Sequence, residues 1–355
     1  MGPDPFTHPW LGGLFADEEV AAPLSPQAQL AQMQRFEAAY SRALGAAGFV
    51  EPDLAEQAAA AIEAATFDME ALRAGTARDG VVVPDLVQQL KAQAGAQLHP
   101  AIHRGLTSQD LTDTALVLAL KELLPLFDAR LAALEAALSA LIAEHGDTPL
   151  TGRTRMQAAL PVTVADRVET WRMPLADHRT RLAEMTPRLL RLQFGGAVGT
   201  RHVLGDKGDA VAAALAGALG LGNPPKAWHA MRDGLGELAS WLSLVAGTLG
   251  KMGQDMALMA QQGIDELKLS GGGGSSAMPH KQNPVRAELL VTLARYTATL
   301  LPGMHHALVH EQERSGVGWT LEWMLLPQML LATGRALNVA NDTVGAIERI
   351  GAPAP

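Results

Sequence analysis

The 355-residue sequence contains no cysteine, so disulfide bonds and thiolate metal sites are excluded. Aromatic residues make up only 4% of the chain, whereas alanine and leucine are abundant. This balance disfavours strands and favours packed helices. Hydrophobic residues make up 48% of the chain, which is enough to bury a large core.

The chain also lacks an excess of basic charge. Its formal net charge of −9 argues against non-specific binding to nucleic acid or to an anionic membrane. No uninterrupted apolar stretch reaches the ~18 residues of a membrane span, and the first residues lack the basic region and apolar run of a signal peptide. The sequence therefore predicts a soluble, cytoplasmic protein that binds neither nucleic acid nor membrane.

Apolar residues recur at helix spacing over most of the chain, after a proline-containing arm of about two dozen residues. We expect helices over residues 27–44, 52–72, 111–144, 164–192, 231–267, 284–309 and 319–349, and a short strand-like run at 81–84. Several of these exceed about 25 residues, which suits an elongated bundle whose apolar faces are covered by partner subunits. The predicted fold is therefore all-α, a long-helix bundle that assembles into an oligomer.

The stretch LSGGGGSSAMPHKQNPVRAE, residues 269–288, departs from the helical pattern. A flexible linker and a phosphate-binding loop are two interpretations of it, but linkers do not usually continue into Met-Pro-His-Lys-Gln-Asn-Pro. A phosphate-binding loop needs Gly-Lys-Ser/Thr at its end, which this stretch does not have. A mobile catalytic loop fits best, because Ser275 and Ser276 supply hydroxyls, Lys281 a charge and Asn283 an amide.

The run GSSAMPHKQNP closely resembles the signature of the fumarase/aspartase superfamily, which includes argininosuccinate and adenylosuccinate lyases. HRGLTSQDLTDTAL, residues 103–116, resembles the Thr-Ser loop of that family, and TGRTRMQAALPVT, residues 151–163, stands where the family typically has Gly-Arg-Thr-His. The resemblance implies a homotetramer in which three subunits build each active site. It also implies an N-terminal helical domain over 1–105 and a central bundle over 106–355, without the usual third, C-terminal domain.

By this resemblance, Ser275 acts as the base in its alkoxide form, and Lys281 helps to stabilise an aci-carboxylate intermediate. The residues expected to bind the substrate are His103, Thr107, Ser108, Gln109, Arg155, Gln157, Ser276, Asn283 and Arg314. Structural alternatives stay open: Ser108 or Asp110 caps the helix that follows, and each arginine pairs with a neighbouring acid. No cofactor is expected, and no metal, because Pro100 interrupts one histidine pair with ligand spacing and no zinc pattern is present.

Arg155 narrows the expected reaction. Family members that expel an amine commonly use the histidine of this region to protonate the leaving group, and arginine cannot act as an acid near neutral pH. A carboxylate leaving group needs no proton, and its elimination or addition opens or closes a lactone. This favours the cycloisomerase branch, which acts on the tricarboxylate 3-carboxy-cis,cis-muconate and which AWHAMRD and HEQERSGVGWTLEW also resemble. The alternatives are a fumarate-releasing lyase of the adenylosuccinate or argininosuccinate type and a non-catalytic scaffold.

Overall fold

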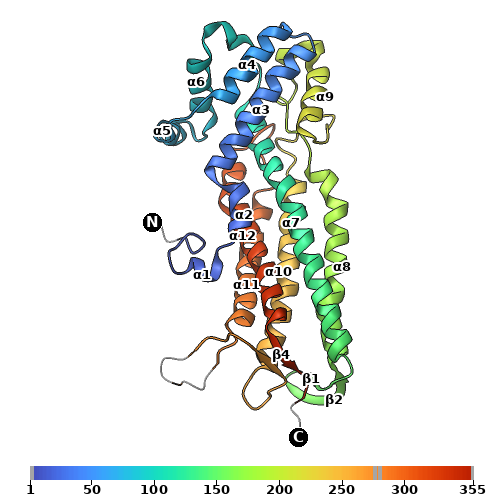
Figure 1. The fold of residues 1–355 in the computed structure, drawn as a ribbon. Coiled ribbons are helices and arrows are strands. Elements are labelled where there is room, and N and C mark those ends of the chain that lie inside the picture. The colour runs from blue at the N-terminus through green and yellow to red at the C-terminus, as the bar shows by residue number, and fades with distance from the viewer. Residues whose placement is uncertain (1–3, 275–277, 279–281, 353–355) are drawn as a thin grey trace.

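The computed structural model describes residues 4–274, 278 and 282–352, which form an elongated, mostly helical molecule (Figure 1). Five long helices run along its length and form a central bundle: α7 (Ser108–His145), α8 (Val164–Leu189), α10 (Asp233–Met259), α11 (Val285–His306) and α12 (Val317–Gly345). At 1.5 Å per residue, the 38 residues of α7 extend about 57 Å. The prediction of an elongated, mostly helical fold is confirmed.

One hydrophobic core holds the bundle together. Helix α10 lies against α8, α11 and α12, and α7 lies against α8 and α12. Side chains such as Phe127, Trp171 and Leu242 are buried in this core, because apolar residues every three or four positions give each helix one apolar stripe. No helix in the described ranges is both long and apolar enough to cross a lipid bilayer.

A second hydrophobic core lies at one end of the molecule, around the first turns of α7 (Figure 1). The helices of this end are α3 (Pro26–Ala46), α4 (Pro52–Ala64), α5 (Met69–Asp79), α6 (Val83–Ala94) and α9 (Gly208–Leu219). Five shorter helices also occur within the described residues, and not all of them lie at this end: α1 (Gly12–Phe15), α2 (Glu18–Ala21), η1 (Ala22–Leu24), η2 (Ala96–Ala101) and η3 (His202–Lys207). This core takes residues from both sides of position 105, and the predicted division of the chain at that position stays a prediction.

The single helix expected over residues 52–72 is wrong. Helix α4 ends at Ala64 and α5 begins at Met69. The carboxylate of Asp68 accepts hydrogen bonds from the backbone N–H groups of Glu70 and Ala71, at 2.9 and 3.1 Å. An aspartate that caps a helix in this way starts a new helix rather than continuing the old one.

The strand-like run at 81–84 is also wrong, because it leads into α6. Val82 already has helical backbone angles, and Val83 and Pro84 begin the helix. Proline is favoured in a first helical turn, where its missing N–H costs nothing. The position of Pro84 therefore outweighs the strand preference of the three valines.

Two small antiparallel sheets lie at the end of the bundle opposite the second core (Figure 1). One pairs β1 (Pro149–Thr154) with β2 (Gln157–Thr163), and the other pairs β3 (Leu267–Leu269) with β4 (Ile347–Ile350). The two residues that join β1 to β2, Arg155 and Met156, have φ of +49° and +66°, as two-residue hairpin turns require. The all-α prediction did not include these strands.

A buried histidine gives the bundle a testable pH dependence. The ring of His178, which is 3% exposed, bonds Thr248 Oγ1 through Nε2 at 2.8 Å and accepts from Arg181 through Nδ1 at 3.3 Å. Burial, reinforced by the Arg181 charge, lowers the pKa of His178 from 6.5 to about 4. The unfolded chain therefore binds a proton between these values while the folded protein does not, so stability falls as the pH falls.

This histidine is expected to contribute about 2 kcal/mol to the loss of unfolding free energy between pH 7 and pH 5. Urea denaturation at both pH values measures the loss, which should shrink by that amount in the variant His178→Gln. His145→Gln, at a more exposed position, is the matched control and should keep the wild-type pH dependence. An unchanged loss in His178→Gln would show that other groups carry it.

Candidate active site

The N-terminus of α7 carries the predicted Thr-Ser loop. Thr107 is the N-cap residue, and its backbone N–H donates to Asp110 Oδ2 at 3.0 Å. Ser108 is the first helical residue. Backbone N–H groups at the start of a helix have no helical partners and carry the positive end of the helix dipole, which suits a carboxylate ligand. Helix capping, through Thr107 and Asp110, is therefore compatible with anion binding at the same turn.

Asp110 ties this turn to the glycine-rich connection that follows α8. Its carboxylate is fully buried and accepts from the N–H groups of Gly195 and Gly196, both at 2.9 Å. It also contacts Nε2 of the buried His229 at 2.8 Å. Gly196 has φ of +71°, and a Cβ there would lie 2.4 Å from the carbonyl oxygen of Gly105. The start of α7 is thus fixed by contacts that leave little room for change.

Two more of the predicted residues lie at this end of α7. Arg314, in the connection between α11 and α12, donates a hydrogen bond to the Thr107 hydroxyl. Over the described residues Arg314 makes no ion pair, so its charge is available to a substrate. His103 has φ of +56° and places Nδ1 2.5 Å from Glu37 Oε1. The structure therefore places Arg314 beside Thr107 at this helix start, with Ser108 next in the sequence and His103 four positions before Thr107.

Gln109 lies next to them but faces the interior. Its side chain is fully buried and donates to Asp113 Oδ2 at 3.1 Å and to the carbonyl oxygen of His229 at 2.9 Å. The predicted contact between Gln109 and the substrate stays a prediction.

A buried ionic network beneath the site was missed by the sequence reasoning. Arg232 bonds Asp113 Oδ2 at 2.6 Å and Glu322 Oε2 at 2.5 Å, and Trp319 Nε1 donates to Asp113 at 3.0 Å. Burial alone would lower the pKa of Arg232, but the two carboxylates outweigh it and raise this pKa, so the guanidinium stays charged. The available signal was an acidic residue that leads into or interrupts an apolar helical run, Asp113 in DLTDTALVLAL and Glu322 in WTLEWMLL.

Three other predicted residues, Arg155, Gln157 and Asn283, lie at the opposite end of the bundle. Arg155 occupies the exposed turn between β1 and β2, and Gln157 begins β2. Over the described residues Arg155 makes no ion pair. Asn283, just before α11, pairs through its backbone with Gly273, at 2.9 and 3.1 Å. The predicted residues Ser275, Ser276 and Lys281 lie outside the described residues.

The two groups of predicted residues are separated by the length of the bundle. Thr107 precedes α7 and the hairpin of Arg155 follows it (Figure 1), so about 57 Å of helix lies between them. Asn283 precedes α11 and Arg314 follows it, across 22 residues or about 33 Å. One chain by itself cannot bring both groups to a single small substrate.

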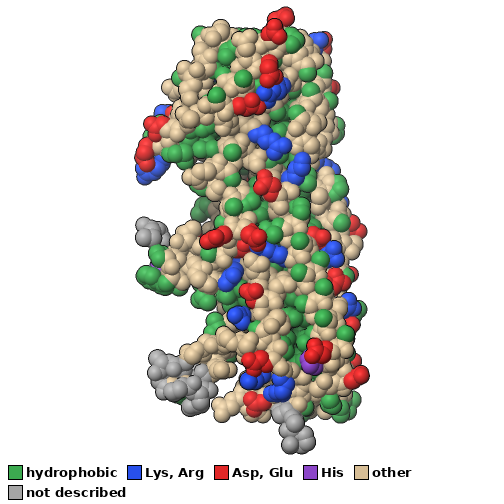
Figure 2. Space-filling view, viewed as in Figure 1, with side chains coloured by type: hydrophobic (Ala, Val, Ile, Leu, Met, Phe, Trp, Pro, Cys, Tyr) green, Lys and Arg blue, Asp and Glu red, His purple; other side chains and the backbone are tan. Residues whose placement is uncertain are grey.

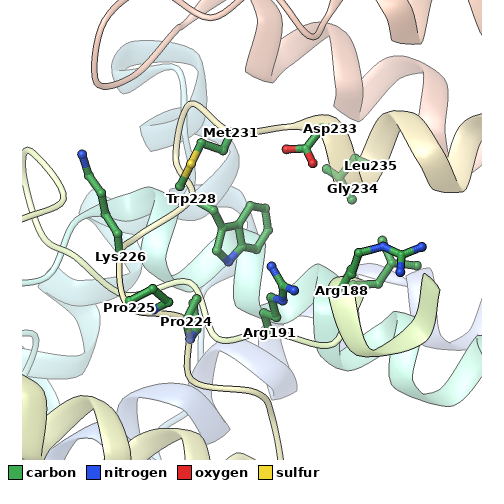
Figure 3. A pocket seen from close by; sticks show the side chains of 11 residues that line it. Arg188, Arg191, Pro224, Pro225, Lys226, Trp228, Met231, Asp233, Gly234 and Leu235 are labelled. Carbon is green, nitrogen blue, oxygen red and sulfur yellow. The ribbon is translucent and has the colours of Figure 1, made fainter. Parts of the chain in front are cut away.

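A cavity of about 290 Å³ lies elsewhere, beside the C-terminal end of α8 and the N-terminal end of α10 (Figure 3). Arg188, Arg191, Lys226 and Trp228 line it, and none of the predicted site residues does. Arg188 is already engaged by Glu237, at 2.5 and 3.0 Å. This cavity is therefore not the candidate active site. Within the described ranges, no three His, Cys, Asp or Glu side chains are placed to hold a metal ion.

A model of the lyase family matches residues 21–296, and the chain belongs to this family. The predicted resemblance to the fumarase/aspartase superfamily is thereby confirmed. The chain is 40% identical to 3-carboxy-cis,cis-muconate cycloisomerase of Pseudomonas aeruginosa over 345 residues, which cover 94% of this chain and 75% of that protein.

Two further relatives are informative. The solved structure of 3-carboxy-cis,cis-muconate lactonizing enzyme from Pseudomonas putida matches with a TM-score of 0.89 and 39% identity, over 96% of this chain and 77% of that chain. N-acetyl-S-(2-succino)cysteine lyase of Dickeya dadantii is 32% identical over 324 residues, which cover 90% of this chain and 71% of that protein. The chain thus spans about three quarters of the length of its relatives.

Proposed function

We propose that this protein is a cycloisomerase that interconverts 3-carboxy-cis,cis-muconate and carboxymuconolactone, a cytoplasmic step in the breakdown of aromatic acids. The observation that carries the proposal is the arginine at position 155, where an amine-expelling lyase would need an acid. It agrees with the names of the relatives that are 40% and 39% identical. An internal carboxylate adds to the double bond or leaves from it, and no group has to protonate it.

The distribution of cations supports a substrate with three carboxylates. Arg314 lies beside the Thr107 hydroxyl, and Arg155 is exposed in its turn. Neither makes an ion pair over the described residues. An arginine matches a carboxylate with two parallel hydrogen bonds. Backbone N–H groups at the start of α7 serve a further carboxylate.

In the lactonising direction, the new carbon–oxygen bond leaves charge on the neighbouring carbon and its carboxylate. Lys281, Asn283 and the Thr107–Ser108 turn stabilise this aci-carboxylate, and Ser275 returns a proton to the carbon. Gln157 and Ser276 complete the substrate contacts, and neither metal nor organic cofactor takes part.

The reaction requires more than one subunit. The two groups of site residues lie at opposite ends of the bundle, so a complete site needs one end of one chain beside the other end of another. Hydrophobic side chains reach the surface along the bundle (Figure 2). The exposed apolar residues of the bundle helices include Leu244 of α10, Met324 of α12 and Met173 of α8, which are 53, 66 and 62% exposed. Long helices with exposed apolar positions favour association, and we propose a homotetramer.

Mixing two variants of low activity tests this sharing of the site between subunits. His103→Ala removes a residue of one end and Asn283→Ala a residue of the other, and each is expected to lower kcat/KM on the order of 10²-fold. When the two variants are denatured and refolded together, some sites receive both intact ends. Activity should then rise by about 10-fold or more above either parent, measured as substrate turnover.

The matched control mixes two variants of the same end, His103→Ala and Thr107→Ala. One chain supplies both His103 and Thr107 to a given site. Each chain in this mixture lacks one of the two residues, so every site stays defective and no activity should return. Equal recovery in both mixtures would contradict a site divided between the two ends.

Turnover of 3-carboxy-cis,cis-muconate tests the function itself. We expect its ultraviolet absorbance to disappear as carboxymuconolactone forms, with no fumarate released. Fumarate release from adenylosuccinate or argininosuccinate, without lactonisation, would establish the lyase alternative. A folded oligomer that turns over none of these substrates would establish the non-catalytic alternative.

A further inference from the structure

The histidine beside the Thr-Ser loop has a buried carboxylate as its partner. His103 Nδ1 lies 2.5 Å from Glu37 Oε1, and the side chains of the two residues are 16% and 0% exposed. Over the described residues, His103 is the sole hydrogen-bond partner of Glu37, whose Oε2 is buried without one. Such an isolated carboxylate is costly to bury.

The nearby carboxylate of Asp110 differs in this respect. It accepts from three backbone N–H groups, those of Thr107, Gly195 and Gly196. These bonds explain Asp110 as a structural anchor. Glu37 has no comparable set of backbone donors. Any role of its carboxylate must therefore be exerted through the imidazole ring of His103.

Helix α3 also forms hydrogen bonds to the backbone on either side of His103. The Ser41 hydroxyl donates to the carbonyl oxygen of Ala101 at 2.7 Å, and the Tyr40 hydroxyl donates to that of Arg104. Glu37, Tyr40 and Ser41 stand at positions i, i+3 and i+4, on one face of the helix. All three are buried, so the same face fixes both the loop and the ring. His103 is held there with φ of +56°, which is uncommon for a residue other than glycine.

We propose that Glu37 is a positioning residue of the active site. By accepting the Nδ1–H of His103, it makes Nε2 the ring nitrogen that meets a carboxylate of the substrate. A partner on one ring nitrogen decides the tautomer and the orientation of the other. To donate to both carboxylates, the ring takes up one proton from solvent at Nε2 when the substrate binds, because only the protonated ring carries an N–H on each nitrogen. This inference rests on the proposed function for the identity of the ligand, but the pairing of Glu37 with His103 does not.

The tautomer of His103 tests the pairing without any substrate. In ligand-free enzyme with 15N-labelled histidine, at a pH where the ring is neutral, NMR should show the proton on Nδ1 and a bare Nε2. The signal is assigned by its disappearance in His103→Ala. Glu37→Met removes the acceptor at similar volume and should move the proton to Nε2, whereas Glu37→Gln keeps an acceptor and should retain it on Nδ1.

Ser41→Ala is the matched control, because it removes a backbone anchor of the same helix face without touching the ring. It should leave the tautomer as in the wild type, even where it lowers the melting temperature. A proton on Nε2 in the wild type, or a tautomer indifferent to Glu37→Met, would overturn the proposal.

A double-mutant cycle tests the catalytic consequence. Glu37→Met is expected to lower kcat/KM about 10–100-fold, as loss of a group that orients a functional histidine does. In a His103→Ala background the same change should have almost no further effect, since the two residues act as one unit. If the two substitutions lowered kcat/KM independently, so that their effects multiplied in the double variant, Glu37 would have only a structural role. If the wild type does not turn over carboxymuconate, the proposed function fails, and the tautomer still decides the pairing.

Discussion

Ser275→Ala is expected to lower kcat/KM for 3-carboxy-cis,cis-muconate by at least ~1,000-fold, the loss typical of removing a group that acts in the transition state. Ser275 lies outside the described residues, and its role as the proton carrier follows from the GSSAMPHKQNP resemblance. Alanine removes the hydroxyl while the four glycines before it keep their backbone freedom. The loss should appear in kcat, because the hydroxyl exchanges its proton with the substrate carbon only as the reaction proceeds.

Ser270→Ala provides the matched control for that measurement. Ser270 stands at the base of the same glycine run, and its hydroxyl donates to the carbonyl oxygen of Ala346 at 3.2 Å. A general disturbance of the loop would reduce activity in both variants. Full activity in Ser275→Ala would mean that another group carries the proton.

The helices were predictable because their signals are local. The periodic run beginning near residue 231 and the absence of proline predicted α10 to within two residues at its start. Its end was placed too late, at 267 instead of Met259. Gly263, with φ of +87°, turns the chain into β3. Apolar residues continue past that turn, so composition did not reveal it.

The β1–β2 hairpin has no comparable signal. Its two strands are largely exposed in the single chain, so they lack the alternation of buried and exposed residues that identifies a strand. Its turn residues, Arg155 and Met156, are not the Asn-Gly pair that marks such turns. Motif resemblance singled out Arg155 as a candidate site residue but gave no conformation for it.

The candidate site shows the same division between local and distant information. Thr107, Ser108 and Arg314 were predicted from short motifs that each occupy a few residues. Glu37 could not be, because its partner His103 lies 66 positions along the chain and α3 carries no motif around it. Long-range pairings between charged groups depend on how helices pack, which a periodic pattern does not specify.

The buried ionic network of Arg232 predicts a large loss of stability when this arginine is replaced. Arg232→Met is expected to lower the free energy of unfolding by about 3–5 kcal/mol, the cost of breaking a buried ion pair by removing one partner. Methionine keeps much of the volume but leaves Asp113 and Glu322, which are 2 and 3% exposed, without their cation. Denaturation by urea, followed by circular dichroism, measures the change.

Arg42→Met is the matched control for this substitution. Arg42 also joins two carboxylates, Glu56 at 2.8 Å and Glu63 at 2.5 Å, but at the surface, where water replaces the lost partner. The urea denaturation midpoint of Arg42→Met should therefore shift far less than the midpoint of Arg232→Met. Adding Asp113→Asn and Glu322→Gln to Arg232→Met removes the stranded charges and should recover part of the loss. If Arg232→Met and Arg42→Met lowered the free energy of unfolding equally, burial of the ion pairs would not determine the loss. If the triple variant recovered none of the loss, the loss would come from altered packing and not from the unpaired carboxylates.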